Sequence, residues 1–116
     1  MITDEPVLTT VKNVVGVSED DHAFDMELIT HTNAALFDLR TIGYGKWRRD
    51  SHVTSASDKW SDILNETEIP SSVPHFIGLK VKRAFDPPST GSQAEALAKL
   101  IENAEWRLLV YMDGGQ

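Results

Sequence analysis

The four histidines are the first side chains in this sequence that could bind a metal ion. They are His22, His31, His52 and His75. No two of them have the i, i+4 spacing that places two imidazoles on one face of a helix, there is no H-E-x-x-H motif, and the chain contains no cysteine. The pattern therefore predicts no metal site.

Carboxylates form two further groups that could do chemistry. The run 18–21 (Ser-Glu-Asp-Asp), followed by Asp25, lacks the D-x-D-x-D-G order of a calcium loop and its turning glycine, so we interpret it as a solvated turn that caps a helix. Glu102 and Glu105 beside Arg107 could serve as an acid–base pair, but helical spacing is typical of surface charges. No Ser-His-Asp pattern or phosphate-binding glycine loop occurs. We therefore expect neither an enzyme nor a cofactor.

One cluster combines an aromatic side chain with positive charge, namely Trp47, Arg48 and Arg49. Tryptophan and arginine are enriched where binding energy is concentrated, which favours an interface anchor, and the same combination could contact a nucleic-acid backbone. A solvent-exposed loop without a partner is the alternative. Arg83 and Arg107 are further interface candidates.

Length and composition indicate a single intracellular domain. The chain has 116 residues, 41% of them hydrophobic and 25% charged, enough for one core. No apolar run is long enough to cross a bilayer, and the N-terminus has no secretory pattern, so we expect no membrane association. The formal net charge of −7 argues against tight binding to DNA, where affinity comes from lysine and arginine.

The elements that carry these residues are predicted to be helices. Apolar residues at helical spacing predict a short helix from Val7 to Val15, ended by Gly16. A long helix follows, with Leu28, Thr32, Ala35, Leu36, Leu39 and Ile42 on one face, and Gly43 and Gly45 end it. The segment 43–56 is expected to be an exposed loop. Ser57 is expected to cap a short helix containing Trp60, Ile63 and Leu64.

The second half of the chain predicts two more long helices. Pro70 and Pro74 suit the opening turn of the first, because first-turn N–H groups have no partner to lose. Its apolar face is Val73, Ile77, Val81, Ala84 and Phe85. The prolines at 87 and 88 must stop it. Ser89, Thr90 or Ser92 then caps the last helix, whose seam is Ala94, Leu97, Ile101, Ala104, Leu108 and Tyr111.

The sequence thus predicts an all-α bundle in one domain over residues 1–116, with three long helices and two short ones. The expected core residues are Val11, Leu28, Leu36, Leu39, Ile77, Val81, Leu97, Ile101 and Leu108. Beyond the seam, Val110, Tyr111 and Met112 are more apolar than a solvated terminus requires, so residues 110–116 form a candidate docking tail. The alternative is that these side chains complete the bundle's own core.

Several stretches resemble one protein family over nearly the whole chain. They are 31–36 (HTNAAL) leading to 43–45 (GYG), 60–62 (WSD), 79–88 (LKVKRAFDPP) and 105–108 (EWRL). The block 79–88 is the most specific. The pattern resembles the head-to-tail connector, or adaptor, proteins of long-tailed bacteriophages and prophages. Two features depart from it: Gly78 stands where a larger apolar or aromatic residue is expected, and the segment Gly45 to Ser57 carries a basic cluster.

The resemblance implies a structural protein of the virion neck. It implies a dodecameric ring, docked beneath the portal through the C-terminal tail, that extends the DNA channel and joins the capsid vertex to a stopper or tail protein. Double-stranded DNA would pass through without sequence-specific binding, and assembly would take place in the host cytoplasm. The alternative functions are a small helical interaction or regulatory module without a ring and, third, a small enzyme.

Overall fold

The computed structural model describes residues 4–45, 47, 52–65 and 69–114. Its helices are α1 (Val7–Val15), α2 (Asp25–Thr41), α3 (Trp60–Ile63), α4 (Ser72–Phe85) and α5 (Gly91–Gly114), and no β-strand occurs among the described residues. The predicted all-α fold is confirmed.

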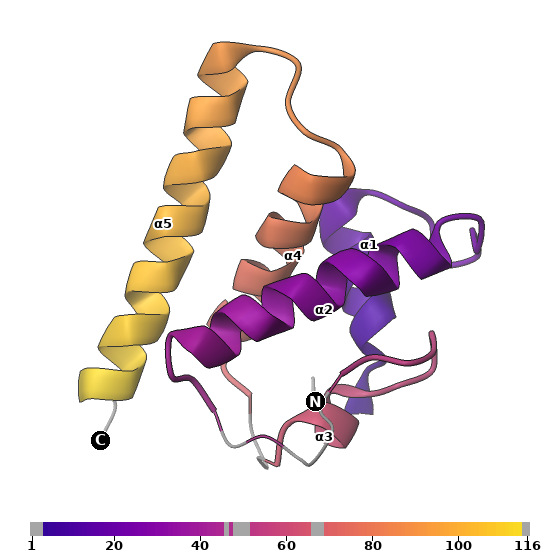
Figure 1. Cartoon of the computed structure of the whole chain (residues 1–116), viewed down its shortest axis with the longest axis horizontal. Coiled ribbons are helices and arrows are strands. Elements are labelled where there is room, and N and C mark those ends of the chain that lie inside the picture. The colour runs from indigo at the N-terminus through magenta and orange to yellow at the C-terminus, as the bar shows by residue number, and fades with distance from the viewer. Residues whose placement is uncertain (1–3, 46, 48–51, 66–68, 115–116) are drawn as a thin grey trace.

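The helices are arranged around α4. Helix α4 packs against α1, α2 and α5. Figure 1 shows α2 crossing in front of α1 and α4, while α5 runs back alongside α4 as an outlying rod at one edge of the molecule. The buried residues of α4 are Val73, Pro74, Phe76, Ile77, Gly78, Leu79 and Val81. Because α5 lies at the edge, much of its surface stays open to partners.

The core follows the predicted apolar stripes, except at several positions, most of them near the ends of the helices. All nine predicted core residues are buried. Ala84 and Ala94 are exposed, Tyr111 is largely exposed, and Phe85 is half-buried, its ring edge-on to Phe24 at a centroid distance of 5.2 Å. The buried seams of α4 and α5 are therefore shorter than predicted.

Gly78 lies where α1 crosses α4. A Cβ atom added there would lie 2.7 Å from the Val14 Cβ, closer than side-chain carbons approach one another. The glycine thus lets the two helices approach closely. This contact explains why the larger residue expected at this position is absent.

The ends of the helices are set by local hydrogen bonds and glycines. Gly16 adopts a left-handed φ of 92° and its N–H donates to Lys12 O at 2.8 Å, which ends α1 as predicted. Thr90 caps α5, since its Oγ1 accepts from the Gln93 N–H at 3.2 Å. Ser57 does not cap α3. Lys59 precedes this helix, and its N–H donates to Asp62 Oδ2 at 2.8 Å.

The connection between α2 and α3 is partly buried, which corrects the expectation of an exposed loop. Tyr44 and Val53 are both buried. The side-chain amide of Asn33 on α2 pairs with both backbone polar groups of Val53. Its Nδ2 donates to Val53 O at 3.0 Å, and its Oδ1 accepts from the Val53 N–H at 2.7 Å. A side-chain amide thus replaces the backbone pairing that a strand would provide.

The start of the chain is tied to α3. The Val7 N–H donates to Asp58 O at 2.8 Å, and the Trp60 N–H donates to Glu5 O at 3.2 Å. The buried indole N–H of Trp60 donates to Thr10 Oγ1 at 3.0 Å, and Thr10 in turn donates to the Glu5 carboxylate. The ring of the fully buried Trp60 therefore packs in the hydrophobic core, and its N–H has a hydrogen-bond acceptor.

A buried lysine anchors the turn between α1 and α2. The Lys12 side chain is only 3% exposed, and its Nζ lies 2.8 Å from Asp25 Oδ1 and 2.8 Å from Asp21 O. The hydrogen bond from Lys12 lowers the pKa of Asp25, against the opposing effect of burial, and His22 adds to the lowering. The acidic turn is thus held by an internal cation, and Asp25 is not simply solvated.

Candidate partner-binding surfaces

Helix α5 presents apolar side chains on two opposite faces. Leu97, Ile101, Ala104 and Leu108 are buried against the core. On the far side, Trp106, Leu109 and Val110 are 63%, 41% and 46% exposed. Their i, i+3, i+4 spacing places them on one face of the helix, and we call this group the outer α5 patch. A helix that is apolar on both sides has a surface available for a partner.

The predicted apolar tail is divided between these faces. Val110 belongs to the outer α5 patch, whereas Met112 is half-buried against the core. The Tyr111 ring, 47% exposed, lies 6.5 Å from the buried Tyr44 ring between centroids. Three apolar residues that are consecutive in the sequence do not share one face of a helix, because successive residues point about 100° apart. The sequence prediction treated them as one group and so missed this division. Trp106 and Leu109, which sequence reasoning did not select, share the face of Val110.

The described part of the predicted Trp47 cluster makes contacts within the chain. Trp47 is half-buried, its Nε1 donates to Tyr44 O at 2.7 Å, and the Arg40 guanidinium carbon lies 4.7 Å from the ring centroid. Arg48 and Arg49 lie outside the described residues. Trp47 is thus fixed to the end of α2, next to the two arginines in sequence.

The other two predicted arginines line separate hollows. Arg83 borders a groove of about 300 Å³ between α2 and α4, beside the ion pair of Lys80 Nζ with Asp38 Oδ2 at 2.8 Å. Arg107 lies across from the start of α4, where it lines a cavity of about 350 Å³ together with Ser71, Ser72 and His75. The two side chains therefore serve different surfaces.

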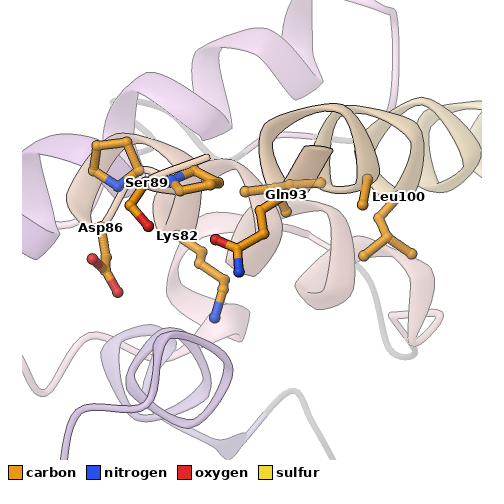
Figure 2. Close-up of a pocket in the computed structure, with 9 residues that line it drawn as sticks. Lys82, Asp86, Ser89, Gln93 and Leu100 are labelled. Atoms are coloured by element: carbon orange, nitrogen blue, oxygen red, sulfur yellow. The ribbon is translucent and has the colours of Figure 1, made fainter. Parts of the chain in front are cut away.

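A larger pocket lies at the turn between α4 and α5. It measures about 490 Å³, and Figure 2 shows Asp86 at one end and Leu100 at the other, with Lys82, Ser89 and Gln93 between them. Pro87, Pro88, Ala96 and Leu97 complete the lining. We call this hollow the α4–α5 pocket. The two prolines that stop α4 therefore also form part of a binding-sized hollow.

Two carboxyl groups with shifted pKa values have structural roles. Asp25 pairs with Lys12, as described above. Burial raises the pKa of Asp58, but hydrogen bonds from Thr54 and Ser55 outweigh this effect and lower it. Asp58 thus organises the turn before α3. The described residues contain no group of three or more side chains placed to hold a metal ion, and none of their helices is long and apolar enough to cross a membrane.

A small helical bundle that exposes apolar side chains on a helix at its edge is typical of proteins that bind other proteins. The family model described as phage connector protein matches residues 7–115, and the chain belongs to this family. No curated protein and no solved structure matches it. The predicted family is confirmed. The family is structural and not typically enzymatic, so the chain is a structural connector that assembles with other head and tail proteins of a phage particle.

Proposed function

We propose that this chain is the head-to-tail adaptor of a long-tailed phage. In this proposal it forms a dodecameric ring beneath the portal, extends the DNA channel and joins the capsid vertex to a stopper or tail protein. Its family supports a connector role, and the observation that carries the finer proposal is the outer α5 patch. An apolar patch on an outlying helix suits a subunit that completes its buried surface only in an assembly.

The charge of the chain suits a conduit for DNA. A formal net charge of −7 repels phosphates. Tight DNA binding depends on the counterions that lysine and arginine displace, and acidic residues outnumber these two types in this chain. The isolated subunit should therefore bind duplex DNA weakly at physiological salt. Tight, salt-sensitive binding would instead favour a nucleic-acid-binding function.

The end of α5 is the proposed contact with the portal. Deleting residues 110–116 removes Val110 and Tyr111, which are both substantially exposed, but leaves the fully buried Leu108. We expect the truncated subunit to fold, with a modest loss of stability from the half-buried Met112, and to lose attachment to portal-bearing heads. Deleting only residues 113–116 is the matched control and should preserve attachment.

Electron microscopy of heads incubated with each protein, together with light scattering, tests the proposal. Rings at the portal vertex with the full chain and the control deletion, but not with the longer deletion, would support it. A full-length chain that never forms a ring, alone or with the portal, would favour a helical interaction module without a ring.

The Trp47 cluster is a second proposed contact, with a neighbouring subunit or with DNA in the channel. Because Trp47 packs within the chain, the sharper variant replaces Arg48 and Arg49 with alanine and retains the tryptophan. We expect normal thermal stability with impaired assembly or DNA retention. Normal particles would remove these arginines from the functional surface.

A further inference from the structure

The α4–α5 pocket and Trp106 lie on opposite sides of α5. Trp106 follows the pocket residue Gln93 by thirteen positions, which is about 20 Å along the helix and about 140° around it. Within one rigid helix the two sites cannot meet. A contact between them must join two copies of the chain.

The pocket has the size and lining that an indole ring requires. Its volume of about 490 Å³ exceeds that of the other two hollows, and Pro87, Pro88 and Leu97 offer apolar walls. The indole N–H is a donor only, and the Asp86 carboxylate at one end of the pocket is an available acceptor. Trp106 is 63% exposed and forms the largest side chain of the outer α5 patch. Buried tryptophans are among the strongest interface anchors.

The charges around the two sites are complementary. Lys99 and Glu102 precede Trp106 by seven and four residues, so they share its face of α5. The pocket carries Lys82 and Asp86. None of these four side chains forms a salt bridge within the described part of the chain. Each site therefore presents one cation and one anion that the other site could pair.

The other strongly exposed aromatic lacks this complement. Phe37 on α2 is 67% exposed, but its neighbours one turn away include Ala34 and Thr41, and the cation there, Arg40, already stacks on Trp47. No carboxylate stands at i±3 or i±4 from Phe37 to meet Lys82. Charge complementarity thus favours Trp106 as the occupant.

We propose that Trp106 of one subunit inserts into the α4–α5 pocket of the next, with Glu102 meeting Lys82 and Lys99 meeting Asp86. This inference rests on the proposed ring and names the contact that builds it. Because the two sites lie on opposite sides of α5, the contact is heterologous: each copy uses its tryptophan toward one neighbour and its pocket toward the other. Such contacts propagate and close into a ring when the rotation between neighbours permits.

Two alanine variants test the occupant. Trp106→Ala should weaken subunit association by about 30-fold, as expected for an interface hot spot, and should leave the circular dichroism spectrum and thermal stability unchanged because the side chain is exposed. Phe37→Ala is the matched control, since it removes another exposed aromatic, and should associate as the original chain does. Association is measured by light scattering, with portal-bearing heads as a template. The reverse ranking of the two variants would overturn the proposal.

Disulfide trapping tests the geometry directly, because the chain contains no cysteine of its own. Ser89→Cys places a thiol at the pocket, and Asn103→Cys places one a turn before Trp106. Within one chain the two positions are separated by about 18 Å of helix, too far for a disulfide. Oxidation of assembled S89C/N103C should yield a ladder of covalent multimers. The control pair S89C/A34C places the second thiol one turn before Phe37, as Asn103 lies one turn before Trp106, and it should give no ladder. A ladder from this control pair, with none from S89C/N103C, would refute the assignment.

Charge reversal separates a specific contact from a general structural effect. Lys82→Glu alone should weaken association because it places a carboxylate opposite that of Glu102. Glu102→Lys alone should weaken it because it places a second positive charge opposite Lys82. The double variant K82E/E102K restores opposite charges and should recover most of the association. Failure of the double variant to recover, while the original chain forms rings, would show that these sites do not meet.

The outcomes distinguish this contact from the proposed function. If W106A forms rings normally and the S89C/N103C variant gives no ladder of covalent multimers, the contact is refuted and the adaptor function is unaffected. An original chain that does not self-associate, even with the portal, would refute both.

Discussion

Replacing Gly78 by alanine is expected to destabilise the protein, although alanine is the better helix former. The added Cβ would lie 2.7 Å from the Cβ and Cγ2 of Val14 and 2.8 Å from its Cγ1. Ordinary carbon contacts are about 3.5–4.0 Å, so roughly 1 Å is missing. Because the Val14 Cβ is fixed to the α1 backbone, rotating the side chain does not relieve the contact. Helices α1 and α4 must move apart.

Two opposing effects set the size of the change. Overpacking a core contact costs about 1–3 kcal/mol, while alanine gains about 1 kcal/mol over glycine within a helix. Val11 and Ile77, close to the crossing in sequence, are fully buried, so separating the helices would also loosen well-packed neighbours. We therefore expect a net loss of about 1–2 kcal/mol. For a chain of this size the melting temperature should fall by about 4–8 °C.

Urea unfolding followed by circular dichroism measures this loss. Gly91→Ala is the matched control, because nothing lies within 4 Å of a Cβ added there, and it should be neutral or slightly stabilising. Adding Val14→Ala to Gly78→Ala removes two of the three close atoms and should restore part of the stability. If G78A proves as stable as the original chain with the same denaturant dependence, the close approach of α1 and α4 is not a determinant of the fold.

Three other substitutions probe the core and its polar groups. Leu108→Ala, at a fully buried position, should cost about 2–5 kcal/mol in the free energy of unfolding; a cost near zero would show that this face is free until assembly. Thr32→Val should stabilise by about 1 kcal/mol in thermal unfolding, since the buried Thr32 hydroxyl has no hydrogen-bond partner among the described residues. Asp25→Asn should cost about 3 kcal/mol at pH 7, because it leaves the buried Lys12 charge without its carboxylate. The folded-state pKa of Asp25 is lowered below 3.8, so this contribution is present above pH 3.8 and is lost as the pH falls through the lowered value; the difference between D25N and the original chain should shrink there.

The parts of the fold that follow from local chemistry could be predicted from the sequence. The ends of α1 at Val7 and Val15 match the expected bounds, because an apolar stripe and a terminal glycine act within a few residues of one another. The break at Asp86 was predicted for the same kind of reason, since proline restricts the residue before it. Helical periodicity also gave the core residues.

The features that depend on where helices meet could not be predicted in this way. The need for glycine at position 78 arises from Val14, which is 64 positions earlier in the chain. Likewise, Val53 is buried because an amide on α2 pairs with its backbone, and nothing in the segment around it signals that partner. The α4–α5 pocket depends on the angle at which α5 leaves the Pro-Pro turn. The outer α5 patch was predictable in principle, since the i, i+3, i+4 spacing of Trp106, Leu109 and Val110 is visible once a second face is sought.

The net charge of each subunit should make ring formation depend on salt in a particular direction. In the proposed ring, neighbouring subunits that each carry −7 would repel one another over distances comparable to the subunit, whose extents are 39 × 31 × 23 Å. Raising the ionic strength from about 0.01 M to 0.15 M shortens the screening length from about 30 Å to about 8 Å, so this repulsion is largely removed, whereas close charge pairs in a buried contact are screened much less. We therefore expect association, measured by light scattering, to strengthen over this range. If added salt weakens association instead, the ion pairs outweigh the overall repulsion, and the acidic surface does not oppose assembly in the way its net charge implies.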